Sequence, residues 1–178
     1  MAAIEQDHRA GPRVGSKTGF TAIVNVLPGH EKALREMIEG DQGKPEIDEA
    51  FREIGTLHEF RWVLLDNDTR VLFASSFDGS WEKYIQDFAA SAIGQMIDRN
   101  LQHVEGWIGI QDPRAGDWLL EHAVPAVQYG CAYPEPSVKQ VWKALAVYKA
   151  FEQVLDDPDG AEALQLPALR PLLNQAAD

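Results

Sequence analysis

The side chains of this sequence that could perform chemistry gather in one short stretch, residues 55–88. His58, Arg61 and Asp78 occur there among mainly apolar neighbours. A histidine can move protons near neutral pH, a carboxylate can act as a base, and a guanidinium can stabilise a developing oxyanion. We therefore take these three residues as candidate catalytic groups.

The strand pattern of residues 57–65 bears on whether the three can act together. His58 and Arg61 are three positions apart, so on a strand they point to opposite faces unless a β-bulge intervenes. The apolar residues that then share the face of His58 are Phe60, Trp62 and Leu64. Two interpretations remain open: a hydrogen-bonded histidine with Arg61 paired to Glu59 or Asp78, or a general base or ligand inside a hydrophobic cavity. Asp78 likewise either caps the following helix or acts as an acid/base carboxylate.

A second group of candidates surrounds residues 104–110, which alternate like a strand. His103, Glu105 and Trp107 fall on its polar side, and we add His103 to the catalytic candidates. Asn25 of the first expected strand should face the same way. Polar and aromatic side chains on one face suit a small-molecule pocket, although a dimer interface would give the same pattern. The expected ligand-binding residues are Asn25, Trp62, Ser75, Glu105 and Trp107.

The elements that must position these residues follow from hydrophobic periodicity and turn signals. Alternating β-branched and apolar residues predict four strands, at 20–27, 57–65, 71–77 and 104–110. Helical spacing predicts helices at 30–39, 46–54 and 80–88, with helical spacing again at 92–97. The order is β-α-β-β-α-β, the ferredoxin-like split βαβ unit of the α+β class.

A sheet of this kind has helices on one face and leaves the other bare. Two copies can cover their bare faces by closing into a barrel across a two-fold axis, so we expect a homodimeric α+β barrel. Three parts are predicted: a flexible arm (1–17), the barrel domain (18–111) and a helical extension packed on that domain (112–178). Helical spacing within the extension predicts helices at 117–126 and 137–155.

Composition narrows the classes of partner. The 178 residues carry a formal net charge of -12, which repels nucleic-acid backbones and anionic lipid, so we expect neither nucleic acid nor membrane as a partner. The sequence also has no secretory signal, no membrane-length apolar run and a single cysteine, Cys131, which together favour the cytoplasm. No metal-ligand spacing is present among the five histidines, so we predict no metal site.

The order of elements and the segment LPGHEKALREMI (27–38) resemble the dimeric α+β barrel superfamily of ferredoxin-like proteins. Cofactor-free monooxygenases, polyketide cyclases and haem-degrading enzymes belong to that superfamily. The segments LHEFRW (57–62) and FASSFDGS (73–80) resemble a poorly characterised subgroup linked by name to dye-decolourising peroxidases. Those peroxidases carry a G-x-x-D-G motif, which the sequence matches at Asp78 and Gly79 but not at Ser75.

These observations lead to one main functional hypothesis and two alternatives. The main hypothesis is a homodimer that binds a hydrophobic small molecule and acts as a cofactor-free cyclase or monooxygenase. His58 or His103 would be its base, and Asn25 or Arg61 would stabilise oxyanion charge. The first alternative is a haem-dependent, peroxidase-like oxidoreductase with His58 or His103 as axial ligand. The second is a non-enzymatic dimeric binding or assembly module.

Overall fold

A computed structural model describes residues 10–176 of the chain, which divides into two compact units, Met1–Val138 and Lys139–Asp178. Of the expected N-terminal arm, residues 1–9 lie outside the described part. The remainder of the arm includes a short strand, β1 (Arg13–Val14). The division falls at Val138, whereas the sequence analysis set the start of the extension at residue 112.

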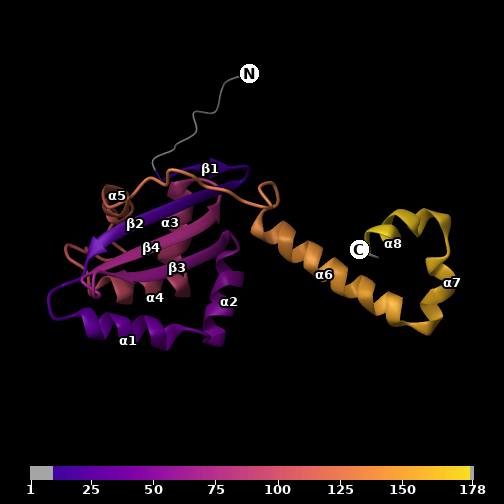
Figure 1. Cartoon of the computed structure of the whole chain (residues 1–178), viewed down its shortest axis with the longest axis horizontal. Coiled ribbons are helices and arrows are strands. Elements are labelled where there is room, and N and C mark those ends of the chain that lie inside the picture. Colours follow the sequence, from indigo (N-terminus) through magenta and orange to yellow (C-terminus); the bar gives the residue numbers. More distant parts are fainter. Residues whose placement is uncertain (1–9, 177–178) are drawn as a thin grey trace, which may run out of the picture. The chain divides into compact units, whose positions relative to one another are not determined.

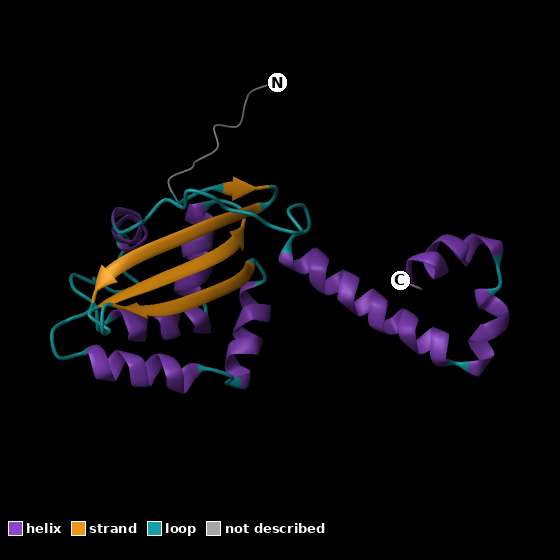
Figure 2. Ribbon diagram, in the orientation of Figure 1, coloured by secondary structure: helices purple, strands orange, loops and turns teal. Residues whose placement is uncertain are grey.

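The first unit is built on a four-stranded antiparallel sheet (Figure 2). Its other strands are β2 (Lys17–Asn25), β3 (Leu57–Leu65) and β4 (Arg70–Asp78), and the spatial order is β1-β2-β4-β3. The three strands predicted at 20–27, 57–65 and 71–77 are confirmed. The β3–β4 turn has three consecutive residues with positive φ, Asp66, Asn67 and Asp68, the residue types that tolerate the left-handed region best.

Helices of the first unit cover one face of this sheet (Figure 1). No helix in the described part of that unit covers the other, which we call the bare face, although Tyr129 packs on Gly19 and Ser76 at one end of it. The covering helices are α1 (Glu31–Asp41), α2 (Pro45–Ile54), α3 (Trp81–Ala90) and α4 (Ala92–Leu101). Serines fix the starts of the last two, since Ser80 Oγ accepts from the Lys83 amide (3.4 Å) and Ser91 Oγ from the Gly94 amide (3.1 Å). The buried core lies between these helices and the alternate strand residues, among them Phe20, Val71 and Phe77. The architecture is thus α+β and compatible with a ferredoxin-like fold.

The prediction of a strand at 104–110 is wrong. Only one bridge forms, between Val26 and Val104, after which Gly106 and Gly109 adopt φ values of 72° and 93° and turn the chain away. The side chain of Asp98 on α4 then holds the loop: its Oδ1 accepts from the Trp107 indole (2.9 Å) and the Ile110 amide (2.7 Å). The alternating residues of 104–110 therefore form a loop that is held by buried side chains, and not a strand.

The outer edge of β2 is instead covered by a later segment of the chain. Helix α5 (Ala115–Glu121) is shorter than the helix predicted at 117–126, because Ala123 already forms a bridge with Ala22. The Val124 amide donates to the Thr21 carbonyl (2.8 Å) beside this bridge. Residues 122–124 thus pair with an edge that the fourth strand of a ferredoxin-like sheet would occupy.

The second unit is helical. It contains α6 (Val138–Asp156), α7 (Ala161–Leu164) and α8 (Arg170–Ala176), with 3₁₀ turns at Pro158–Gly160 and Pro167–Leu169. The helix predicted at 137–155 is confirmed by α6. None of the helices in the described part of the chain combines the length and the apolarity needed to cross a membrane.

Candidate functional site

His58 lies at an irregularity of β3. The pairing of β3 with β4 shifts between Leu57 and Glu59, so a β-bulge absorbs His58. As a result Leu57 is buried on the helix side, whereas Arg61 is exposed on the bare face as the alternation predicted. The expectation that His58 shares the apolar face of Phe60 is wrong, because the bulge directs its ring to the end of β4.

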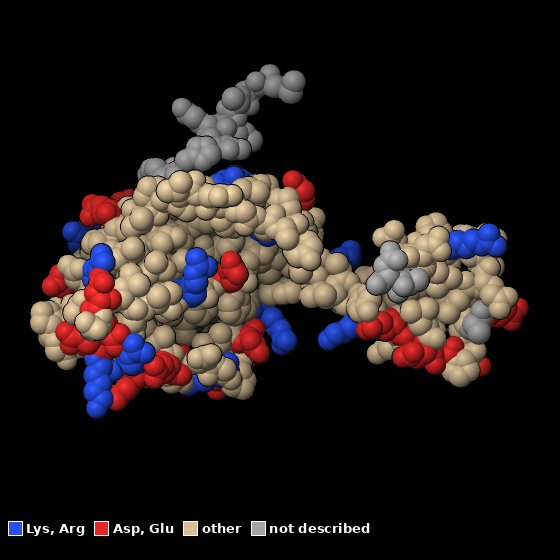
Figure 3. All heavy atoms as spheres, viewed as in Figure 1, with Lys and Arg blue, Asp and Glu red and all other residues tan. Residues whose placement is uncertain are grey.

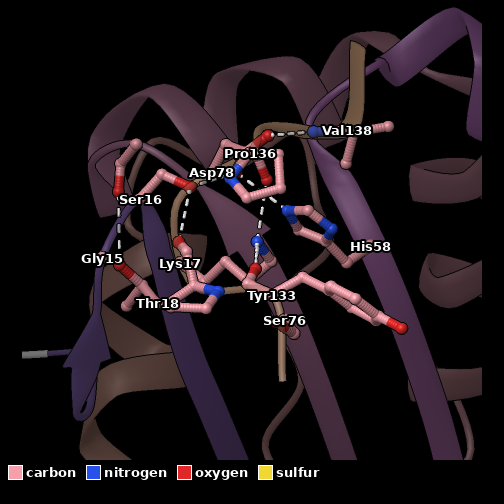
Figure 4. A network of polar contacts seen from close by, with 12 residues as sticks. Gly15, Ser16, Lys17, Thr18, His58, Ser76, Asp78, Tyr133, Pro136 and Val138 are labelled. Atoms are coloured by element: carbon pink, nitrogen blue, oxygen red, sulfur yellow. Dashed lines mark hydrogen bonds and ion pairs between the residues drawn. The ribbon is translucent and has the colours of Figure 1, made fainter. Parts of the chain in front are cut away.

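There the His58 ring meets Asp78, and the two predicted catalytic residues are in direct contact (Figure 4). Nε2 of His58 donates to Oδ1 of Asp78 (2.8 Å), with the side chains only 15% and 12% exposed. The pairing of Arg61 with Asp78 considered from the sequence does not form, since the Asp78 partners are His58, Ser16 and Val138. The capping role falls to Ser80 on α3, while Asp78 accepts the backbone amide of Val138, the first residue of α6 (2.8 Å).

Asp78 is the centre of a polar network that fastens residues 129–138 to the sheet (Figure 4). Lys17, which is 5% exposed, donates to the carbonyls of Tyr133 and Pro136, the latter at 2.8 Å. The Ser16 amide donates to the Pro134 carbonyl (3.0 Å). The hydroxyls of Ser76 and Tyr129 share a hydrogen bond of 2.6 Å, and Tyr129 lies where a side chain at Gly19 would clash. We call residues 129–138 the strap.

The hydrogen bonds of the His58–Asp78 pair are thus made with other residues of the same chain. The carboxylate of Asp78 accepts hydrogen bonds from the His58 ring, the Ser16 hydroxyl and the Val138 amide. Because this carboxylate is nearly buried, these hydrogen bonds stabilise the segments that supply the donors. Neither member of the pair lines any of the main cavities of the described residues. The arrangement explains a structural role for both residues.

A second contact cluster lies at the other end of β2. Nδ2 of Asn25 donates to the Glu105 carboxylate (3.0 Å), and the Nδ1 atoms of His30 and His103 lie 3.1 Å apart. Burial lowers the pKa of His103 below its ordinary value, and the neighbouring His30 lowers it further. Asn25, Glu105 and His103 are therefore close together as expected, but they form a polar rim in which Asn25 and Glu105 are exposed and His103 is half-buried, and they line none of the main cavities of the described residues.

Trp107 and Ser75 both make contacts within the core of the first unit. Trp107 packs edge-on against Trp118 with ring centroids 4.9 Å apart, and Trp118 in turn stacks on His122. Ser75 accepts a hydrogen bond from the buried hydroxyl of Tyr84 (2.8 Å). Burial raises the pKa of Tyr84, so its hydroxyl stays a neutral donor. Neither Trp107 nor Ser75 lines any of the main cavities of the described residues.

A cavity of about 390 Å³ lies on the helix side of β3. It is bordered by α1, the α1–α2 loop, α2, β3 and α4, and includes two predicted site residues, Arg61 and Trp62. Its lining residues are Ile38, Asp41, Gln42, Gly43, Ile47, Phe60, Arg61, Trp62, Met96 and Asn100. A neighbouring hollow of about 370 Å³ shares Asp41, Ile47 and Met96 with it.

Unpaired polar atoms distinguish this cavity from the rest of the core. Asn100 is 1% exposed, yet neither its Nδ2 nor its Oδ1 has a hydrogen-bond partner among residues 10–176. The buried indole N–H of Trp62 is likewise unpaired within that range. Asp41 holds Lys44 at 2.7 Å through Oδ1, while its Oδ2 accepts no hydrogen bond from the described residues and lies 3.7 Å from Arg99.

The sequence analysis missed Asn100, although a signal for it exists. Asn100 continues the buried stripe of α4 formed by Ile93, Met96 and Ile97, at a position that faces the core. A polar residue in such a stripe is uncommon and needs a partner. The helical spacing predicted at 92–97 ends before Asn100, so the prediction did not place this residue on the buried face.

The structure also bears on metal binding. Within residues 10–176 there is no group of three or more histidine, cysteine or acidic side chains that could hold a metal ion.

Comparison with known proteins adds no relative: no family model, no curated protein and no solved structure matches the chain. The assignment to the dimeric α+β barrel superfamily therefore stays a prediction based on the quoted segments.

Proposed function

We propose that the protein binds a small, largely apolar molecule in the cavity between β3 and helices α1, α2 and α4. Its volume of about 390 Å³ lies within the range of about 300–1,000 Å³ that is usual for ligand pockets. The walls combine aromatic and aliphatic side chains, including Phe60, Trp62 and Met96, with the polar side chains of Asp41, Gln42, Arg61 and Asn100. This composition suits an apolar ligand held in orientation by a small number of hydrogen bonds.

The unpaired amide of Asn100 is the observation that carries the proposal. Leaving a buried polar group without a partner costs about 1–3 kcal/mol, so a core position normally avoids it. Asn100 and Trp62 both line the cavity, and both have buried polar atoms without a partner among the described residues. A ligand that supplies the missing partners would regain this energy on binding.

The proposal concerns binding and contains no acid/base step. The predicted bases, His58 and His103, line none of the main cavities of the described residues, and the polar contacts of their rings are with Asp78 and His30. The haem alternative is tested separately by adding haem to purified protein, where an axial histidine would give a shifted Soret band. If such a band appears, its loss in His58→Ala or in His103→Ala would identify the histidine that binds the haem iron.

Filling the cavity tests the proposal directly. Ile47 lines both the cavity and the adjoining hollow, so Ile47→Phe should reduce the space available to a ligand. We expect small aromatic compounds to raise the melting temperature of the wild type and to have little effect on this variant. Ile108→Phe is the matched control, because Ile108 is exposed and lies outside the cavity.

Two results would contradict the proposal. One is the absence of any thermal shift across a library of apolar fragments, together with no co-purified mass in native mass spectrometry. The other is an equal shift in the wild type and in a correctly folded Ile47→Phe variant, which would mean that the compounds bind elsewhere.

A further inference from the structure

Two residues that line the cavity, Asn100 and Trp62, have unpaired polar atoms, and the chemistry of these atoms specifies more than the presence of a ligand. The Asn100 amide offers a donor, Nδ2, and an acceptor, Oδ1, side by side in one plane. Both atoms are unpaired within the described part of the chain, so either orientation of the amide presents a donor beside an acceptor. A ligand with only a ketone oxygen would engage the donor and leave Oδ1 buried without a partner.

The charges near the cavity argue against an ionised ligand. The carboxylate of Asp41 already holds Lys44 at 2.7 Å, and Arg99 lies 3.7 Å from its other oxygen. The groups that lack partners on Asn100 and Trp62 are neutral, an amide and an indole N–H. Arg61 also lines the cavity, but it is exposed to solvent, which screens its charge. A ligand charge brought against the buried amide and indole would lose its hydration without an opposite charge beside it, which is strongly unfavourable.

We infer that the cavity selects neutral, mainly apolar molecules that carry a carbonyl group directly beside an N–H, as lactams and cyclic secondary amides do; this inference rests on the proposed binding function. The ligand carbonyl accepts from Nδ2 of Asn100 while the ligand N–H donates to Oδ1, which satisfies both amide atoms at once. The indole N–H of Trp62 provides a further donor for a second acceptor on the ligand. Phe60 and the indole of Trp62 provide aromatic walls for a flat ring.

Three matched probes test this inference on the full chain: quinolin-2-one, its N-methyl derivative and naphthalene. Dissociation constants come from NMR titration of backbone amide signals. We expect quinolin-2-one to bind about tenfold or more tightly than the N-methyl compound, because methylation removes the donor and leaves Oδ1 unpaired.

The variant Asn100→Leu separates hydrogen bonding from shape. It should bring quinolin-2-one to the affinity of the N-methyl compound, whereas naphthalene, which makes no hydrogen bond, should not bind more weakly than to the wild type. If the preference for quinolin-2-one persisted in this variant, the methyl group would be rejected by shape, and the inference would be wrong. Gln102→Leu, which replaces an exposed amide just beyond the same helix, is the control and should keep the wild-type preference.

The remaining outcomes separate the inference from the proposed function. Equal affinities of quinolin-2-one and its N-methyl derivative in the wild type, with naphthalene also bound at the cavity, would overturn the lactam preference alone. If none of the three probes shifts a signal from the cavity, both the lactam preference and the proposed binding function fail.

Discussion

At the scale of single residues, Asn100 links binding to stability. Because its amide has no partner in residues 10–176, Asn100→Leu should remove a buried polar cost while keeping a side chain of similar size. We expect the free energy of unfolding of the ligand-free protein to rise by about 1 kcal/mol. Urea denaturation of the wild type and the variant measures it.

The control for this prediction is Gln102→Leu, which should change stability by less than about 0.5 kcal/mol because Gln102 is exposed. A clear loss of stability in Asn100→Leu would show that the amide is satisfied in solution, for example by buried water.

His103 provides a residue-scale prediction about pH. Its pKa is lowered from 6.5, first by burial and second by the charge of His30. The unfolded chain therefore binds a proton on this group more readily than the folded chain does, so His103 reduces stability as the pH falls below 6.5 and has no effect above it. His30→Ala removes the second cause and should raise the pKa of His103 only part of the way, because burial remains.

Titration of the histidine ring signals by NMR checks this expectation. His122→Ala is the control, since His122 packs on Trp118 and is not the neighbour of His103. An unchanged His103 pKa in His30→Ala would mean that the two rings do not interact in solution.

At the scale of elements, Asp78 and the strap give a prediction about local opening. Asp78→Ala removes the acceptor of the Val138 amide and also the partner of His58 and Ser16. We expect a loss of about 2 kcal/mol in local protection. Hydrogen exchange should show faster exchange in residues 129–138, with the β3–β4 pairing unaffected.

Asp112→Ala is the matched control, because Asp112 also accepts a backbone amide but from Arg114, within its own loop. Faster exchange spread evenly over the first unit in Asp78→Ala would contradict the local role, since it would indicate loss of global stability.

The same elements show what the sequence could and could not predict. Periodicity identified β2, β3, β4 and the helices between them, because each buries one regular face. It failed at residues 104–110, where the alternation is real but Gly106 and Gly109 turn the backbone with positive φ. It also failed at His58, because a bulge shifts register without changing the residue pattern around it. The contact of Asp78 with Val138, 60 positions later in the chain, depends on the strap and cannot be predicted from local sequence patterns.

At the scale of the whole molecule, the bare face of the sheet bears on assembly. Cross-strand register places Ile23, Leu72 and Val63 side by side in one apolar row on that face, and Val63 is 38% exposed. Arg61 is also exposed on this face, and Figure 3 shows basic and acidic side chains within the tan surface of the first unit as well as along its margin. The exposed apolar row favours burial against a second, identical face across a two-fold axis.

The homodimer expected from the sequence therefore has a definite test. Light scattering at tens of micromolar protein should give about twice the chain mass of 19.8 kDa. Val63→Asp would bury a carboxylate in the contact and, by symmetry, oppose it to a second one, so the mass should fall to that of a single chain. Ile108→Asp is the matched control, because Ile108 is a comparably exposed apolar residue, at 37%, that does not belong to the sheet. A wild-type mass near 19.8 kDa, or a dimer that survives Val63→Asp, would mean that the bare face is not the contact between copies.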